Sequence, residues 1–345
     1  MSEANIFDPS TLARMAELMR QHGLIEQDDL SIKRLTGGQS NPTFLMTAGS
    51  KRFILRKKPD GTLLPSAHAI DREFRVMKAL QDTNVPVPKM GFYDESSDIL
   101  GTPFYVMAFL DGRVLFDQSL PGFTVADRTA VYHDLNRVMA ALHTLDPQAI
   151  GLADYGRPGN YFERQIARWS RQYLADPGTR IPALESLIDK LPKHIPSGEL
   201  HAIVHGDFRL DNVVLHPTEP RIIGVLDWEL STLGHPVADF AYHCMSWHIP
   251  PSLWRGIAGL DLKSLGIPNE SDYVDLYIQN TGFKDVKTHW NFYLAYNFFR
   301  IAAILHGIGQ RVRQGNAASP DAIDMATKAA PLADIGWRYA QRLGD

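Results

Sequence analysis

The chain has 345 residues, of which 44% are hydrophobic, so it can build sizeable cores and is not a disordered protein. A chain of this length rarely folds around a single hydrophobic core, so two lobes are expected. The formal net charge of −4 gives no basic footprint for nucleic acid, and the single cysteine, Cys244, permits no internal disulfide, as is typical of the cytoplasm.

The N-terminal segment predicts a helix and no targeting signal. It has neither a charged n-region nor an apolar h-region, and no apolar run in the chain reaches membrane-spanning length. Asp8 is placed to cap a helix whose first turn contains Pro9, and Gly23 is placed to end it. The apolar face of this helix would comprise Leu12, Met15, Leu18 and Met19.

Residues 30–57 alternate as strands around a glycine-containing loop, Thr36–Asn41. Adjacent Gly37 and Gly38 would let backbone N–H groups approach a phosphate without a Cβ in the way. An ordinary hairpin turn is the alternative interpretation. The chain has no G-x-x-x-x-G-K-[ST] segment, so a Walker-type nucleotide site is not supported.

A basic strand and an amphipathic helix follow. The strand from Phe53 carries Arg56 and Lys58 on one face and Lys57 on the other, because strand side chains alternate. A solvated basic edge strand would look the same. The helix is predicted to open at Pro65-Ser66, to carry Glu73, and to bury a stripe of apolar side chains: Ile70, Phe74, Met77 and Leu80.

Beyond the helix, Thr102–Met107 reads as a buried strand that leads out through Ala108–Gly112. From Thr124 onward the chain is mainly helical, and the aromatic residues of 242–320 fall at helical spacing, which is typical of core. Three basic residues of that region would suit an acidic substrate, or would simply face solvent: Arg300, His306 and Arg311.

Residues 201–230 contain the side chains that point to chemistry. Short β-branched runs predict three buried strands, with Asp207, Asn212 and Asp227 next to them. Phosphoryl transfer needs metal ions on the phosphate oxygens and a base near the attacking hydroxyl. Asn212 and Asp227 offer the hard oxygen ligands that Mg²⁺ takes, and Asp207 is then available as the base. Alternatively, Asp207 and Asn212 only tie a turn.

This segment resembles the aminoglycoside phosphotransferase/choline kinase family, whose motif is HGD-x-x-x-x-N followed by an Asp-aromatic pair. Here His205-Gly206-Asp207 is followed by Asn212 and then by Asp227-Trp228-Glu229. More narrowly, the chain is similar to kinase-like domains associated with acyl-CoA dehydrogenases. The resemblance implies an α+β, two-lobed, protein-kinase-like fold. The small β-rich N-lobe would comprise residues 1–110, and the larger, mainly helical C-lobe residues 111–345.

The resemblance also assigns roles. Arg56, paired with Glu73, would contact the phosphates, with Lys58 as the alternative cation. Ser40 and Asn41 would belong to the nucleotide loop, and adenine would bind backbone groups near Ala108 and Leu110. Asp239 and His205 would support the catalytic loop, whereas a metal contact by Glu229 is left open because protein kinases have glycine at this position.

We therefore expect a phosphotransferase that uses ATP and Mg²⁺ to phosphorylate a hydroxyl of a small metabolite, without nucleic-acid or membrane partners. The sequence does not choose between ATP and GTP and says nothing of the oligomeric state. The segment 242–320 lacks the dense acidic cluster that an aminoglycoside would need, and relatives near acyl-CoA dehydrogenases suggest a hydroxy acid or hydroxyacyl-CoA. The alternatives are a nucleotide-binding pseudokinase acting as a sensor, or a metal-dependent hydrolase.

Overall fold

The computed structural model describes residues 7–26, 29–35, 41–60, 69–157, 159–178, 180–198, 200–314 and 322–344. The glycine loop over 36–40, which includes Ser40, and the expected helix start at Pro65-Ser66 lie outside these residues. The chain forms two compact units. Unit 1 consists of Met1–Gly112 together with Ile223–Glu229, and unit 2 of Arg113–Ile222 together with Leu230–Asp345.

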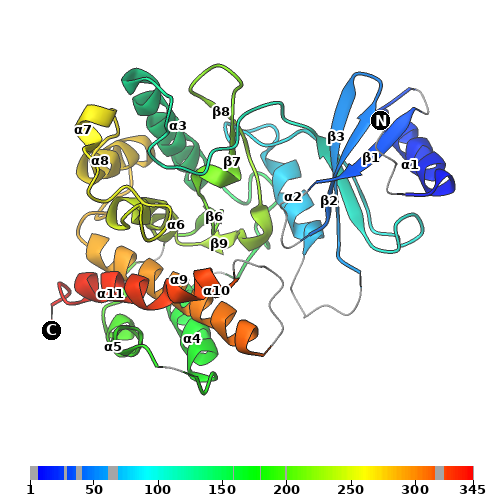
Figure 1. Ribbon diagram of the computed structural model, residues 1–345. Helices are drawn as coiled ribbons and strands as arrows, with labels where there is room; N and C mark the ends of the chain where they lie inside the picture. The colour runs from blue at the N-terminus through cyan, green and yellow to red at the C-terminus, as the bar shows by residue number, and fades with distance from the viewer. Residues whose placement is uncertain are drawn as a thin grey trace. The chain divides into compact units, whose positions relative to one another are not determined.

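Unit 1 is organised by a five-stranded antiparallel sheet with the order β1-β2-β3-β5-β4 (Figure 1). Its strands are β1 (Leu30–Arg34), β2 (Thr43–Ala48), β3 (Lys51–Lys57), β4 (Met90–Asp94) and β5 (Phe104–Ala108). The register places Arg56 of β3 opposite Thr43 on one side and opposite Tyr105 on the other. Directly opposite residues share a face of the sheet, so Arg56 and Tyr105 point to the same side.

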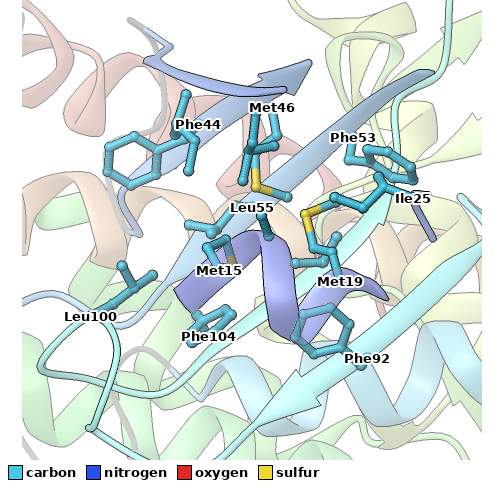
Figure 2. Close-up of a cluster of buried hydrophobic side chains, with 14 residues drawn as sticks. Met15, Met19, Ile25, Phe44, Met46, Phe53, Leu55, Phe92, Leu100 and Phe104 are labelled. Atoms are coloured by element: carbon cyan, nitrogen blue, oxygen red, sulfur yellow. The ribbon is translucent and has the colours of Figure 1, made fainter. Parts of the chain in front are cut away.

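Helix α1 (Pro9–Gln21) completes the core of unit 1 (Figure 2). As predicted, Asp8 caps the helix by accepting hydrogen bonds from the backbone of Ser10 and Thr11. Met15 and Met19 are fully buried in a cluster with side chains of the sheet, among them Phe44, Met46, Leu55 and Phe104. The helix is therefore a structural part of unit 1.

The second helix of unit 1, α2 (Ile70–Leu80), carries Glu73 in its first turn. Its buried stripe differs from the predicted one at one position: Val76 is fully buried, whereas Phe74 is half-buried against the Tyr93 and Tyr105 rings. Strand β8 (Ile222–Val225) brings the chain back into unit 1, where Gly224 packs under Leu110. A Cβ at position 224 would lie 2.1 Å from the Leu110 side chain, so any larger residue would require that side chain to move.

Unit 2 is mainly helical and contains a small antiparallel β6–β9 ladder (Figure 1). Its helices are α3 (Val125–His143), α4 (Tyr161–Leu174), α5 (Pro182–Lys190), α6 (Pro236–Cys244), α7 (Leu262–Leu265), α8 (Glu270–Thr281), α9 (Trp290–Arg313), α10 (Ala322–Thr327) and α11 (Ala329–Ala340). Its 3₁₀ turns and strands are η1 (Leu191–Lys193), η2 (Leu210–Asn212), η4 (Met245–His248), β6 (Ala202–Val204), β7 (Val213–Leu215) and β9 (Thr232–Gly234), and η3 (Trp228–Leu230) spans a boundary between the units.

Helix α9 is the central helix of unit 2, and α4, α6, α10 and α11 pack against it. Aromatic side chains fill the core as predicted: the Phe240 ring stacks on Tyr277 with centroids 3.8 Å apart, and Tyr273 and Tyr296 are fully buried. Strands β6, β7 and β8 also form where the sequence predicts them. Within the described part of the chain, no helix combines the length and apolar character needed to cross a bilayer.

Candidate active site

In unit 1, Arg56 joins two carboxylates that are far apart in the sequence. Its Nε lies 3.4 Å from Glu73 Oε2, and its Nη2 donates to Asp227 Oδ1 at 3.0 Å. The Glu229 carboxylate is 4.0 Å away. Because one guanidinium meets carboxylates from α2 and from the segment after β8, it fixes the position of both.

Glu73 is the buried centre of this cluster. Its side chain is fully buried and accepts hydrogen bonds from Tyr105 Oη and Asn41 Nδ2, both at 3.0 Å. Burial raises the pKa of Glu73 to about 7, although the Arg56 charge acts in the opposite direction. The Arg56–Glu73 pair implied by the resemblance is present, and Asn41 lies against Glu73 as part of the same polar cluster.

The other basic residues of the strand have different surroundings. Lys57 is buried on the opposite face of β3 and pairs with Asp60 at 2.8 Å, and Lys58 lies just beyond the end of the strand. Arg56 is therefore the residue of this basic run that meets Glu73 and Asp227. In β5, the Ala108 amide donates to the Lys89 carbonyl at 2.8 Å and is thus engaged within unit 1.

Asp227 has an unusual backbone conformation. Its φ is +63°, in the left-handed region that aspartate tolerates better than most residues. The neighbouring Trp228 is buried and donates from Nε1 to the Val225 carbonyl at 3.0 Å, which holds the turn. The Asp227 side chain remains 36% exposed, so its second oxygen can reach a ligand.

In unit 2, Asp207 is held by donors on both of its carboxylate oxygens. Tyr242 Oη donates to Oδ1 at 2.5 Å, while Asn212 Nδ2 and Arg209 Nη2 each lie 3.0 Å from Oδ2. The preceding Gly206 has φ +82°, and a Cβ there would lie 2.7 Å from the Leu230 carbonyl oxygen. Glycine is therefore required next to the candidate base.

Asn212, at the end of η2, binds the catalytic loop through the nitrogen of its side-chain amide. Its Nδ2 donates to both the backbone oxygen and the carboxylate of Asp207, at 2.9 and 3.0 Å. An amide oriented in this way keeps its oxygen as an acceptor. The oxygens of Asn212 and Asp227 are of the kind that Mg²⁺ prefers, and this ion usually keeps several waters and substrate phosphate oxygens as its other ligands. The described residues contain no cluster of three or more His, Cys, Asp or Glu that would hold a metal by itself.

Asp239 supports the loop, as expected. Its carboxylate accepts from the backbone amides of His205 and Gly206, at 2.7 and 2.8 Å, and lies 3.2 Å from His143 Nε2. Burial by itself would raise the pKa of Asp239, but these hydrogen bonds and the neighbouring histidines lower it below its usual value. His205 Nδ1 accepts from the Asp207 amide at 3.2 Å, so His205 also serves the loop.

Sequence reasoning missed two residues of this site, Arg209 and Tyr242. Arg209 also lies 3.5 Å from Asp211, which pairs in turn with Arg255. Tyr242 is three positions after Asp239 on α6 and therefore lies on the same helix face, which is the signal that could have found it. Burial and the Asp207 charge raise the pKa of Tyr242, so its phenol stays protonated as a donor.

Arg300 of α9 borders the same loop. Its Nη2 donates to the Gly206 carbonyl at 2.9 Å, and its guanidinium lies over the Tyr242 ring, 5.4 Å from the centroid. The two other basic residues singled out with it lie elsewhere: His306 is buried 3.5 Å from Asp176, and Arg311 is exposed.

Comparisons with known proteins show the family of the chain. A sequence model of the phosphotransferase enzyme family matches residues 31–259, more than half of the chain. The chain belongs to this family. The chain is 45% identical to acyl-CoA dehydrogenase family member 10 of Mus musculus over 309 residues, which are 89% of this chain and 29% of that protein. It is 38% identical to family member 11 of Homo sapiens, covering 97% of this chain and 43% of the relative. The chain thus spans less than half the length of these curated relatives.

Solved structures confirm the expected fold class. The chain matches a protein of Ralstonia eutropha JMP134, named as a candidate aminoglycoside phosphotransferase, with a TM-score of 0.89 and 52% identity, over 98% of this chain and 100% of that one. It also matches choline kinase from Cryptosporidium parvum with a TM-score of 0.66 over 96% of this chain and 95% of that one. At 13% identity, the second match shows the fold alone.

Proposed function

We propose that this protein moves the γ-phosphate of ATP to a hydroxyl of a small metabolite. Family membership and the kinase-like fold support a small-molecule phosphotransferase. The main observation in support of the proposed reaction is the arrangement of Asp207 and Asn212 in unit 2. The carboxylate is held by three donors, while the amide that helps to hold it keeps its oxygen available for a ligand.

In this proposal Asp207 accepts the proton of the acceptor hydroxyl as its oxygen attacks the γ-phosphorus, and ADP leaves. Asn212 and Asp227 would bind Mg²⁺, which supplies charge neutralisation on the phosphates. Arg56, oriented by Glu73, would contact the phosphate oxygens in place of the lysine found in protein kinases. Such positioned groups are typically worth about 10²–10⁴ in rate each.

The proposed nucleotide contacts remain Ser40, Asn41, Ala108 and Leu110. The Asn41 side chain bonds to Glu73, so a contact from this residue would come from its backbone. The Ala108 amide is used within unit 1, which favours the Leu110 amide as the donor to adenine.

Arg300 favours an acidic acceptor. Its guanidinium donates to a backbone carbonyl and lies over Tyr242, and no carboxylate of the described residues lies within ion-pair distance of it. A largely enclosed cation without a direct ion pair attracts an anionic group, although the Asp207 charge already acts on Arg300. A hydroxy acid or its CoA thioester would bring such a group next to the catalytic loop, whereas a polycationic acceptor would be repelled.

The test begins with thermal melting in Mg²⁺-ATP, Mg²⁺-GTP and Mg²⁺ alone, because a ligand that binds only the folded state raises the melting temperature. Transfer from γ-labelled ATP is then measured for hydroxy acids and hydroxyacyl-CoAs, with Asp207→Asn and Asp227→Asn as matched, nearly isosteric variants. We expect Asp207→Asn to bind Mg²⁺-ATP and to lose at least 100-fold in turnover.

The two alternative functions have distinct outcomes in this experiment. Nucleotide binding without transfer to any acceptor would indicate a sensor, and turnover that needs Mg²⁺ but no nucleotide would indicate a hydrolase. Arg300→Met should raise KM for an acidic acceptor at least tenfold and leave KM for ATP unchanged. Equal KM values for the acceptor would refute the role of Arg300.

A further inference from the structure

The segment between η4 and α7 brings a distant arginine, Arg255, to the catalytic loop of unit 2. Arg255 Nη1 donates to Asp211 Oδ2 and so forms an ion pair with a residue of η2. Asp211 directly precedes Asn212, and only 9% of its side chain is exposed. The segment thus places a positive charge on a carboxylate beside the proposed metal ligand.

The backbone at Arg255 is strained and closely packed. Its φ is +23°, a positive value that an arginine seldom adopts. Gly256 follows, and a Cβ there would lie 1.7 Å from the Ile249 carbonyl oxygen. A backbone hydrogen bond from Ile257 to Ser246, at 2.8 Å, closes the loop. Strained conformations persist only where the surrounding structure enforces them, and they concentrate at functional sites.

A single carboxylate oxygen of Asp211 faces two arginines. Asp211 Oδ2 is bonded to Arg255 and also lies 3.5 Å from Arg209 Nη2. The same Nη2 lies 3.0 Å from Asp207 Oδ2. Arg209 therefore lies between the carboxylate of the candidate base and that of Asp211, and it is closer to the base. The two arginines and the two aspartates together carry no net charge.

Loss of the Arg255 charge would change this balance. Asp211 would keep a mostly buried negative charge, and its remaining ion-pair partner among the described residues would be Arg209. Because opposite charges attract strongly where little water screens them, Arg209 would move toward Asp211 and away from Asp207. Asp207 would then lose one of its three donors, and a displacement of about 1 Å near the reacting groups can cost about 100-fold in rate.

We propose that Arg255 is a positioning residue for phosphoryl transfer: it neutralises Asp211 and thereby keeps Arg209 on the carboxylate of Asp207. The proposal rests on the proposed function, because it takes Asp207 as the base. Arg255 lies outside the catalytic motif, 44 positions after Asp211 in the chain. It acts on the base through Asp211 and Arg209 and does not bond to Asp207 itself.

A double-mutant cycle tests this role, because an effect that passes through Asp211 disappears when the charge of Asp211 is removed. Turnover is measured for Arg255→Met in the wild-type background and in the Asp211→Asn background. We expect Arg255→Met to lower kcat at least tenfold in the wild-type background and less than threefold in the Asp211→Asn background. The KM for Mg²⁺-ATP should stay within threefold in all four proteins.

The matched control is Arg338→Met, which removes an exposed arginine of α11 and should leave kcat unchanged in both backgrounds. Arg255→Gln, which removes the charge but keeps a donor, takes the place of Arg255→Met in the cycle if that variant does not fold. A merely structural role of Arg255 predicts equal losses of kcat in the two backgrounds. Equal losses, or no loss in the wild-type background, would overturn the proposal.

A second measurement needs neither acceptor nor nucleotide. In the full chain with isotopically labelled arginine, the side-chain magnetic resonances of Arg209, assigned with Arg209→Lys, report the surroundings of its guanidinium. Arg255→Met should shift them at least twice as far in the wild-type background as in the Asp211→Asn background. This result in a protein that phosphorylates no acceptor would refute the proposed function but support the coupling of Arg255 to Arg209. Equal shifts in a protein that does transfer phosphate would refute the role of Arg255 alone.

Discussion

Glu73→Ala tests the buried cluster of unit 1 most directly. The substitution removes the acceptor of Tyr105 and Asn41 and one of the two close carboxylates of Arg56. Breaking a buried ion pair costs about 3–5 kcal/mol, and each donor left unsatisfied costs about 1–3 kcal/mol. Arg56 keeps Asp227, and water can enter the space and satisfy the donors, so we expect only the ion-pair contribution, about 3–5 kcal/mol of local stability.

The measurement is hydrogen exchange of the β3 and β5 amides, which reports the free energy of opening this part of the molecule. Tyr105→Phe removes one of the donors, and combining it with Glu73→Ala should give a total about 1 kcal/mol smaller than the sum of the single effects. Glu17→Ala, which removes an exposed carboxylate of α1, should leave β3 and β5 unchanged. A loss below about 1 kcal/mol for Glu73→Ala would show that the cluster does not hold unit 1 together.

Three further predictions concern unit 2. Tyr242→Phe removes the donor to Asp207 Oδ1, and it should lower kcat about tenfold and leave KM for ATP unchanged; an unchanged kcat would contradict it. Asp239→Asn weakens two charge-assisted bonds to the loop amides and should cost about 100-fold in kcat while Mg²⁺-ATP still raises the melting temperature. Burial lowers the pKa values of His235 and His243 to about 4. Between pH 7 and pH 5 these two imidazoles therefore take up protons in the unfolded chain but not in the folded protein. Each histidine should lower the free energy of unfolding by about 2 kcal/mol as the pH falls over this range. In urea unfolding, the free energy of unfolding of His243→Gln should fall about 2 kcal/mol less between pH 7 and pH 5 than that of the wild type. An equal fall would contradict the low pKa of His243.

Local patterns in the sequence predicted a large part of the fold and some of the site. The Asp8 cap and the spacing of Met15 and Met19 give α1 directly, and β-branched runs give β6, β7 and β8. The Arg56–Glu73 pair came from the family resemblance. The supporting role of Asp239 likewise came from the family resemblance, and its hydrogen bonds to the loop amides agree with that role.

Features that depend on contacts between distant segments could not be predicted in this way. The hydrogen bond from Asn41 to Glu73 spans 32 positions, and that from Tyr242 to Asp207 spans 35. The burial of Val76 in place of Phe74 depends on which side of α2 meets the sheet, and both residues fit an amphipathic helix. Periodicity describes a single segment, so partners contributed by another segment carry no local signal.

The seven residues Ile223–Glu229 have a consequence for how the protein is made. They belong to unit 1, although 110 residues of unit 2 precede them in the chain. A nascent chain that has emerged as far as Gly112 holds Arg56 and Glu73 but lacks Asp227, which follows Arg56 by 171 positions. The N-terminal unit can begin to fold early during synthesis, yet it is complete only after the ribosome has passed the middle of the chain. Cutting the gene after codon 112 would therefore yield a fragment that lacks part of its own interior.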